Sequence, residues 1–295
     1  MKRQIPKLRK IPSALAFALL FSICSCQVSP TRVYESNSPK AKNQVELQID
    51  EKTIFVDARP AFEYSVSHLN GAIPLRPEDF TQREAPFLGL LDLDLFSLTR
   101  HLARLGIAPD SKVVVVGRGP EGKGEEGRVA WTLRYLGVNN TRYASMAYFT
   151  KPLTASEAPP RLNAVIWKPE LDSSLQISRD ELLQEMKKSE SLPVAEKAVL
   201  IDVRSSEQYL HSQATSSQLN PINVPWTEFL SFKGLPNTEI KTKLEAIGIK
   251  TSRKVILISD QGIESALVTL VLKDLGYSRA TNMSGGYLEL NSKKF

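Results

Sequence analysis

Cysteine is nearly absent from this chain of 295 residues, because Cys24 and Cys26 are its two cysteines and residues 27–295 contain none. A disulfide within residues 27–295 is therefore excluded, and so is chemistry there that needs a thiol of this chain. Histidine is scarce as well. Neither His101 nor His211 has an acidic or cysteine residue at metal-ligand spacing, so both are predicted to be surface residues, and we expect no metal and no cofactor.

A long apolar run is also lacking. The run Ile11–Ile23 is uncharged but shorter than the 20 or so residues that a membrane-spanning helix needs. It follows five basic residues and no acid, which is the pattern of an export signal. Those five charges account for most of the net charge of +6 and leave residues 27–295 near +1, which does not support nucleic-acid binding.

The exit from the apolar run is more specific. Ile23-Cys24-Ser25-Cys26 resembles a bacterial lipoprotein box, with a branched residue, a small residue and then the lipidated cysteine. We predict a signal peptide at 1–25, lipid on Cys26 and a Ser-, Pro- and Asn-rich tether at 26–44. Cys24 is the poorer candidate because Ile23 is bulky, and an ordinary cleaved signal without lipid is the alternative. Gln27 in place of Asp favours the outer membrane or cell surface.

The rest of the chain contains one pattern twice. Each copy has a buried strand that ends in Asp-x-Arg, a second short strand, a loop, and a helix closed by glycine. The segments are 53–59, 113–116 and 128–137 in the first copy, and 198–204, 255–258 and 265–276 in the second. The interval from the strand aspartate to the second strand is 56 residues after Asp57 and 53 after Asp202, which indicates a duplicated unit.

The duplication predicts an α/β fold with two tandem domains, each a parallel sheet flanked by helices. We place the domains at 45–150 and 166–295, with a proline-containing linker at 151–165. Ser178 and Glu181 form the pattern of a capping box, which predicts a helix near the start of the second domain.

These motifs resemble tandem rhodanese domains, the architecture of thiosulfate and mercaptopyruvate sulfurtransferases. The motifs that carry the resemblance are D-A-R-P-A-F-E-Y at 57–64, D-V-R-S-S-E-Q-Y at 202–209 and S-G-G-Y-L-E at 284–289. The resemblance covers about residues 46–295 and implies a rhodanese fold. It also implies a persulfide-carrying cysteine at the start of a C-x-x-G-x-R-S-A loop in the second domain. The strand aspartates are expected to accept backbone hydrogen bonds, and His68 is expected to be a packing residue.

The corresponding loop keeps its frame but lacks the cysteine. Its residues are Ser259, Asp260, Gln261, Gly262, Ile263, Glu264 and Ser265, followed by Ala266. Ser259 stands at the nucleophile position, and a hydroxyl is barely ionised at neutral pH and cannot store sulfur as a stable persulfide. Glu264 replaces a basic residue, and Asp260 adds a further negative charge. Gln208 stands where two-domain relatives have a substrate-binding arginine.

The loop of the first copy has another pattern. Gly117, Gly122, Lys123 and Gly124 form a strand–G-x-x-x-x-G-K–helix arrangement that is similar to a phosphate-binding loop. Glycine 124 replaces the Ser or Thr that would hold magnesium, and two glutamates follow it. A surface or contact loop is the favoured interpretation, and anion binding is the alternative.

The sequence therefore predicts a membrane-anchored, catalytically degenerate rhodanese-like protein that binds a protein or a small molecule outside the cytoplasm. The rival hypothesis is an enzyme of the sulfurtransferase family with residual or altered activity. Hydrolysis through Ser259 belongs to the same class but needs an adjacent base, and the sequence shows none.

Overall fold

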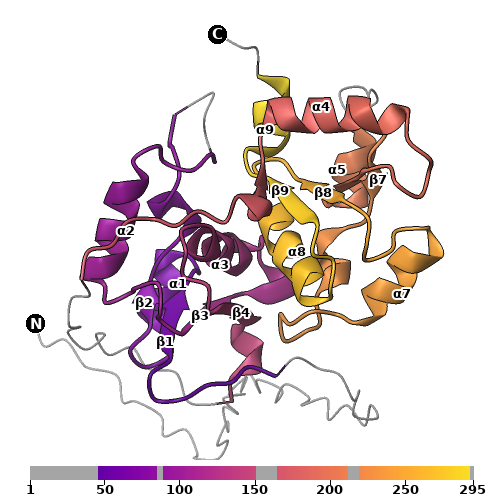
Figure 1. Cartoon of the computed structure of the whole chain (residues 1–295). Helices are drawn as coiled ribbons and strands as arrows, with labels where there is room; N and C mark the ends of the chain where they lie inside the picture. Colours follow the sequence, from indigo (N-terminus) through magenta and orange to yellow (C-terminus); the bar gives the residue numbers. More distant parts are fainter. Residues whose placement is uncertain (1–45, 85–88, 151–164, 212–218, 293–295) are drawn as a thin grey trace, which may run out of the picture. The chain divides into compact units, whose positions relative to one another are not determined.

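The computed structural model describes residues 46–84, 89–150, 165–211 and 219–292. The predicted signal peptide, the predicted tether and residues 151–164 of the predicted linker lie outside the described residues. The described residues belong to one compact unit (Figure 1). A helix long and apolar enough to cross a bilayer does not occur among the described residues.

The first half of this unit alternates strands and helices. Its strands are β1 (Ile54–Asp57), β2 (Ile73–Pro74), β3 (Val113–Gly117) and β4 (Thr141–Ser145). Its α-helices are α1 (Ala61–Val66), α2 (Leu95–Arg104) and α3 (Glu125–Tyr135). Its 3-10 helices are η1 (Pro77–Asp79), η2 (Gly119–Glu121) and η3 (Met146–Tyr148).

The second half repeats the order. Its strands are β5 (Gln176–Ile177), β6 (Val199–Asp202), β7 (Ile222–Asn223), β8 (Val255–Ile258) and β9 (Ala280–Met283). Its α-helices are α4 (Arg179–Glu190), α5 (Ser206–His211), α7 (Glu239–Ala246), α8 (Ile263–Asp274) and α9 (Gly286–Asn291). Its 3-10 helices are η4 (Ser173–Leu175) and η5 (Trp226–Phe229).

The two sheets confirm the predicted duplication. The first sheet has the order β2-β1-β3-β4, and the second has β7-β6-β8-β9 in the same sense with β5 added beyond β9. All strand pairs within both sheets are parallel. The strands β3 and β8 are buried along their whole length, as their runs of Val, Ile and Leu predict. The structure is therefore the expected α/β fold with parallel sheets flanked by helices.

Capping chemistry sets the helix boundaries. The Ser178 side chain accepts from the backbone N–H of Glu181, and the Glu181 carboxylate accepts from the N–H of Ser178, which confirms the predicted capping box of α4. The helices after β3 and β8 begin earlier than predicted, at Glu125 and Ile263. Both follow a glycine with positive φ, whose left-handed conformation turns the chain into the helix.

The two halves share one apolar core, which contains buried residues of α3 and α8. The two helices pack closely because Gly127 has no side chain, since a Cβ there would lie 2.1 Å from the Cβ of Leu267. Trp131, fully buried on α3, donates through its indole N–H to the carbonyl of Leu175 in the second half. These contacts bring the beginnings of α3 and α8, and the loops before them, close together.

Candidate functional site

The loop between β8 and α8 holds the residues of the predicted active-site loop. Ser259 directly follows β8, Gly262 caps the helix, and Ile263 is its first residue. Gly262 has φ +72° and lies against the carbonyl of Ser284, so that a Cβ at this position would stand 2.0 Å from that oxygen. The S-G-G-Y segment at 284–287 therefore packs directly against the loop at Gly262, and only glycine fits there.

The side chain of Ser259 is sealed inside the protein. The residue has no exposed surface, and its Oγ lies 3.1 Å from the Oγ of Ser265. The backbone N–H of Ser265 donates to Ser259 Oγ over 3.4 Å, and the carbonyl of Ser259 accepts from the N–H of Tyr287. The two contacts with Ser265 thus join the end of β8 to the first turn of α8 through the Ser259 hydroxyl.

Two acidic residues follow Ser259 in the loop, Asp260 directly and Glu264 five positions later. Burial raises the pKa of Glu264, whereas a hydrogen bond with Ser259 and the charge of Lys123 lower it. The structure therefore places beside Ser259 a carboxyl group that the sequence alone did not identify as its partner. A serine nucleophile also needs an accessible hydroxyl and an oxyanion hole, and the hydroxyl here is fully buried.

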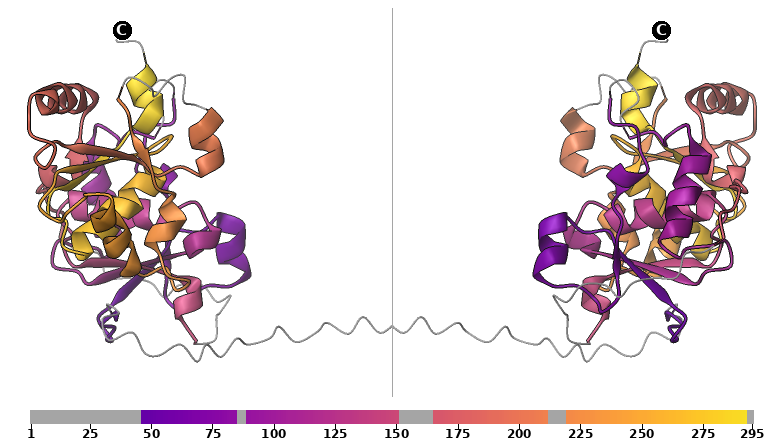
Figure 2. Two further views of the ribbon diagram at one scale, coloured as in Figure 1. Left: turned by 90° about the vertical axis from the view of Figure 1, so that its right-hand side faces the viewer. Right: turned by 90° about the vertical axis from the view of Figure 1, so that its left-hand side faces the viewer.

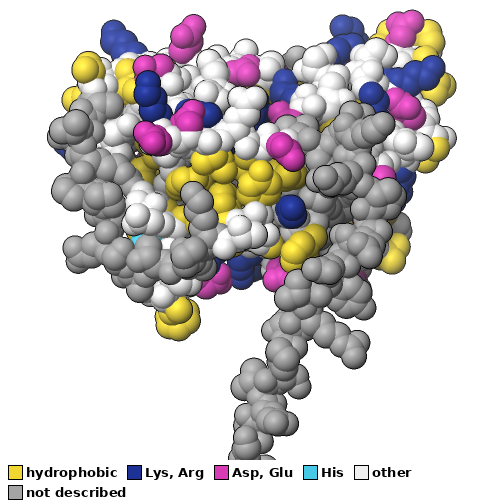
Figure 3. All heavy atoms as spheres, turned by 90° about the horizontal axis from the view of Figure 1, so that it is seen from below, with side chains coloured by type: hydrophobic (Ala, Val, Ile, Leu, Met, Phe, Trp, Pro, Cys, Tyr) yellow, Lys and Arg dark blue, Asp and Glu magenta, His cyan; other side chains and the backbone are white. Residues whose placement is uncertain are grey.

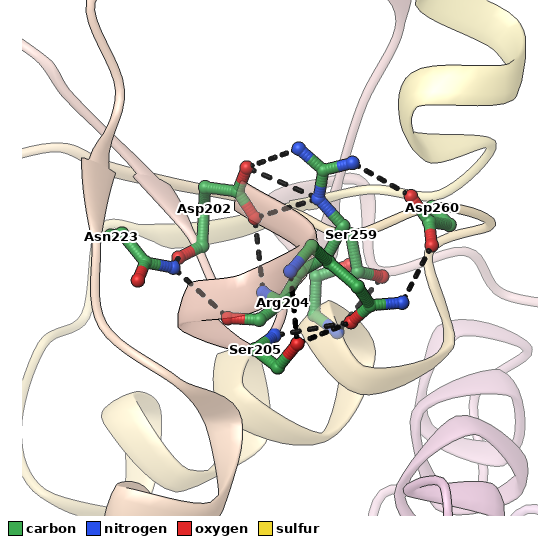
Figure 4. Close-up of polar contacts among 8 residues, drawn as sticks. Asp202, Arg204, Ser205, Asn223, Ser259 and Asp260 are labelled. Carbon is green, nitrogen blue, oxygen red and sulfur yellow. Dashed lines mark hydrogen bonds and ion pairs between the residues drawn. The ribbon is translucent and has the colours of Figure 1, made fainter. Parts of the chain in front are cut away.

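Asp260 neutralises the cation at the mouth of the same loop (Figure 4). Its Oδ1 lies 2.9 Å from Nη1 of Arg204, and its Oδ2 accepts from Nε2 of Gln208 over 3.3 Å. The Asp260 side chain is half exposed, with 52% of its surface accessible. The Asp260 carboxylate therefore pairs with the guanidinium of Arg204 on the exposed side of the loop.

Arg204 is also held from behind by the strand aspartate. Its Nη2 lies 2.6 Å from Oδ2 of Asp202, and its guanidinium lies 4.0 Å from the centre of the Tyr287 ring. Burial lowers the pKa of Arg204, but hydrogen bonds and charges from Asp202 and Asp260 outweigh it and raise that pKa. The backbone N–H of Arg204 donates to Asp202, and the first half repeats this bond from Arg59 to Asp57, which confirms the predicted role of both aspartates.

The loop of the first half, between β3 and α3, is held by its own glutamate. Six residues separate Gly117 from Gly124, against two between Ser259 and Gly262. The Glu125 carboxylate accepts from Nε of Arg118 over 2.8 Å and from the backbone N–H of Lys123 over 2.7 Å. The hydrogen bond to Glu125 is the main reason that the pKa of Arg118 is raised.

This arrangement changes what the predicted anion loop offers a ligand. Gly122 packs against the Glu125 carboxylate, since a Cβ there would lie 2.8 Å from its Oε2. The backbone N–H that a phosphate would use at Lys123 is therefore already taken. A cavity of about 300 Å³ lies beside this loop. Three basic side chains line it, those of Arg76, Arg118 and Lys123, together with Glu78, Glu125 and apolar residues.

Glu126 is a functional candidate that sequence reasoning missed. It is the second residue after the capping glycine of α3, as Glu264 is in α8. The residue is fully buried, and both carboxyl oxygens lack a hydrogen-bond partner among the described residues. Burial and the neighbouring charge of Glu125 raise the pKa of Glu126 to about 8. The sequence signal that could have revealed it is that a glutamate stands two positions after the capping glycine in both halves, as Glu126 and as Glu264.

Arg128 links the two halves behind the loops. Its Nη1 donates to the carbonyls of Gly262 and Ser284 over 3.0 and 3.1 Å, and its Nη2 donates to the carbonyl of Gly89. The residue is almost fully buried, and burial lowers its pKa to about 10. An arginine of the first half thus fixes the backbone of the loop in the second half.

The histidines have the positions that were predicted. His68 is buried, its Nδ1 lies 2.8 Å from the carbonyl of Tyr64, and its ring stacks on the Tyr64 ring. His101 and His211 are exposed. Within the part of the chain that the structure describes, no three His, Cys, Asp or Glu residues gather as a metal site would require. Cys26, the predicted lipid attachment site, lies outside that part.

Comparison with protein families gives two matches along the chain. The model of the rhodanese-like domain matches residues 41–148 and residues 178–293. These ranges contain both Asp-x-Arg motifs and both loops described above. The first range contains the four strands of the first sheet, and the second contains β6, β7, β8 and β9 of the second sheet.

Individual proteins are also similar. A thiosulfate sulfurtransferase of Azotobacter vinelandii is 26% identical over 247 residues, which cover 80% of this chain and 87% of that protein. The crystal structure of a probable thiosulfate sulfurtransferase matches with a TM-score of 0.58 and 24% identity over 82% of this chain and 96% of the other. The Tum1 protein of Saccharomyces cerevisiae matches with a TM-score of 0.64 and 16% identity, covering 82% and 90%. These two structural likenesses concern the fold.

Proposed function

The chain belongs to the rhodanese-like domain family, and on that basis we propose that it is a lipid-anchored member that has lost sulfur transfer and acts as a binding module. The observation that carries the proposal is Ser259 at the end of β8, buried and paired with Ser265. A rhodanese needs a thiolate that holds sulfane sulfur, and thiolate chemistry is not available to a hydroxyl. No cysteine follows Cys26 in the sequence.

The charges around the loop support the same conclusion. Thiosulfate and mercaptopyruvate are anions, and the half-exposed Asp260 would repel them while it neutralises Arg204. Gln208 donates to Asp260 and brings no positive charge. The exposed part of this loop is thus a polar recognition surface, and we assign the binding of a protein or small molecule to it.

The anchor is the second part of the proposal. Lipid on Cys26 would attach the protein to a membrane outside the cytoplasm, at the outer membrane or cell surface. Lipoprotein processing adds more than one acyl chain, which binds a bilayer stably where a single chain would bind marginally.

The sulfur chemistry is tested by a thiosulfate–cyanide assay on the purified chain. We expect no thiocyanate above the background of the Ser259→Ala variant, which serves as the matched control. Turnover that is clearly above this background and is abolished by Ser259→Ala would contradict the proposal. The same pair of proteins, assayed with generic ester substrates, tests hydrolysis through Ser259 and Glu264.

Lipidation is tested separately by metabolic labelling with a fatty acid. We expect the label to be lost in Cys26→Ala and kept in Cys24→Ala. The reverse result would move the anchor to Cys24, and label in neither protein would leave an ordinary cleaved signal as the explanation.

Anion binding at the first loop is a second candidate, favoured by the cavity of about 300 Å³ between Arg76, Arg118 and Lys123. Glu125 competes for the same groups, so a phosphate must displace a carboxylate or bind beside it. Calorimetry with inorganic phosphate and with ATP tests this function. Heat of binding that Lys123→Ala abolishes would support it, and no detectable heat would exclude it.

A further inference from the structure

One face of the sheet is covered by a helix in the second half, and the corresponding face of the first half has no such helix among the described residues. In the second half, Leu200 and Ile256 lie on a face that α4 covers with Leu182 and Met186, and Leu200 is 2% exposed. The strands correspond in register, because Phe55 pairs with Val114 as Leu200 pairs with Ile256. Phe55 is nevertheless only partly buried.

A counterpart of α4 is lacking among the described residues of the first half. The helix α4 precedes β6, whereas the described chain before β1 is the segment 46–53, which contains no helix. By the spacing of the second half, the counterpart would begin near residue 34. That position lies outside the residues that the structure describes.

The face that corresponds to the one covered by α4 carries an apolar cluster in the first half, and we call it the lower face. Its partly buried side chains lie over Val114 and Val116 and are Leu47, Phe55, Tyr64, Met146 and Phe149. The rings of Phe55 and Phe149 meet edge to face with centroids 5.7 Å apart. Both views in Figure 2 place β1 near the bottom of the described part, and Figure 3, taken from below, shows hydrophobic side chains gathered at the centre.

Cations accompany this apolar cluster. Arg142 is exposed and lies opposite Val114 in the register of β3 and β4, so its side chain shares the lower face. The amino group of Lys233 lies 5.8 Å from the centre of the Tyr148 ring, next to Phe149. On the entering segment 46–53, Asp50 is paired with Lys112, and Glu46 and Glu51 are exposed. An apolar centre with aromatic residues and arginine or lysine at its edge fits the boundary between lipid tails and phosphate headgroups.

The position of the predicted anchor favours a membrane as the occupant. Leu47 belongs to the lower face, and Ile49 two residues later is 39% exposed, so the chain enters the folded unit at this face. Nineteen residues separate Cys26 from Glu46. A fully extended segment of that length reaches at most about 65 Å, so an anchor at Cys26 would keep the lower face close to the bilayer.

We propose that the lower face of the first sheet rests on the lipid bilayer, with its aromatic residues at the headgroup level and Arg142 towards the phosphates. The inference rests on the proposed lipid attachment of Cys26. The anchor supplies proximity, and the lower face sets the orientation. The loop at Ser259–Ser265 belongs to the other half and would be presented to partners in a fixed direction.

A spin label on the protein tests this orientation. The full chain is expressed with lipid processing and reconstituted into vesicles of phosphatidylethanolamine and phosphatidylglycerol. Because no cysteine follows Cys26, Ile49→Cys provides a single labelling site two residues from Leu47 of the lower face, and Lys187→Cys on the exposed side of α4 provides the control. Accessibility to oxygen and to a water-soluble nickel chelate is then measured for both labels.

We expect the label at 49 to become several-fold less accessible to nickel when vesicles are present, while the label at 187 stays accessible. Equal exposure of both labels to nickel would overturn the inference. Shielding of the label at 49 in detergent, with broadening between spins, would also overturn it and assign the face to a second copy. The mass of the N-terminal peptide reports acylation of Cys26 independently, so failure of the anchor is distinguished from failure of the orientation.

Discussion

The side-chain oxygens of Ser259 and Ser265 lie 3.1 Å apart in a buried pair that joins the end of β8 to the first turn of α8. The backbone N–H of Ser265 points to the same Ser259 oxygen. A residue at the position expected of a nucleophile thus has a structural use. Its hydroxyl satisfies a buried side chain and one of the free N–H groups at the start of a helix.

Replacing Ser259 by alanine should reduce stability and leave partner binding unchanged. The substitution leaves the buried Ser265 hydroxyl without this partner, which costs about 1–2 kcal/mol in the free energy of unfolding. Urea denaturation of the two single variants and of Ser259→Ala/Ser265→Ala measures the coupling between them. Coupling energies near zero would show that the hydroxyl pair is not stabilising.

Installing a thiol should not by itself restore sulfur transfer. We expect Ser259→Cys to give little thiocyanate in the thiosulfate–cyanide assay, because Asp260 continues to neutralise Arg204 and Glu264 remains nearby. The double variant Ser259→Cys/Asp260→Asn should be faster than the single one, since it frees Arg204 for the anionic substrate. Asp260→Asn alone is the control. A single variant as fast as the double would show that the charges at the loop do not limit the reaction.

Much of the fold could be predicted because local signals and burial agreed. The valine run of β3 and the apolar run of β8 predicted buried parallel strands, and the capping box predicted the start of α4. The repeated Asp-x-Arg motifs predicted the equivalence of the halves. These features depend on residues that are neighbours in the sequence, and tertiary contacts reinforced them.

The polar partners around the loops could not be predicted in the same way. The G-x-x-x-x-G-K pattern suggests a phosphate cradle, but Glu125 folds back onto Arg118 and the N–H of Lys123. Arg128 reaches carbonyls 134 and 156 residues away, and no local pattern specifies such partners. The burial of Glu126 also depends on packing that brings distant segments together. Sequence reasoning therefore located the loops and missed the groups that hold them.

Arg128 should be one of the most sensitive positions for stability. Arg128→Met would remove the Arg128 donor from the carbonyls of Gly262, Ser284 and Gly89, of which Gly262 keeps the side-chain amide of Asn282, at a cost of about 3–5 kcal/mol. Arg128→Lys should recover only part of this loss, because one ammonium group cannot reproduce the forked geometry of the guanidinium. Arg142→Met, at an exposed arginine, is the control and should change stability by less than about 0.5 kcal/mol. Equal effects of Arg128→Met and Arg142→Met in chemical denaturation would refute the proposed link.

Glu126 should make the protein less stable as pH rises. Its pKa is about 8 in the folded protein and near the ordinary 4.5 when unfolded, so the folded state binds the proton more tightly. Between these two values the free energy of unfolding should fall by up to about 1.4 kcal/mol per pH unit from this group. Burial and the charge of Glu125 raise the pKa of Glu126, whereas the nearby backbone N–H groups of Glu126 and Gly119 and the charge of Arg118 lower it.

Glu126→Gln tests this dependence, because an amide cannot ionise in the buried site. Urea denaturation at about pH 5 and about pH 8 should show a smaller loss of stability for the variant than for the unchanged protein. Glu121→Gln, at an exposed glutamate of the same loop, is the matched control and should keep the original dependence. The same pH dependence in all three proteins would place its origin outside Glu126.

Gly262 should tolerate no side chain, because of backbone strain and because of a collision with Ser284. Gly248, which has the strain without the collision, separates these two causes. Gly262 and Gly248 have similar φ angles, +72° and +83°. A Cβ at Gly262 would lie 2.0 Å from the carbonyl oxygen of Ser284, whereas a Cβ at Gly248 would have nothing within 4 Å. Gly248→Ala should therefore cost about 1 kcal/mol, from backbone strain alone. Gly262→Ala adds a collision with backbone and should cost more than about 3 kcal/mol. Because the S-G-G-Y segment would have to move away from the loop, thermal denaturation should separate the two variants clearly. Similar losses in both would mean that the close approach of the two segments does not exist in solution.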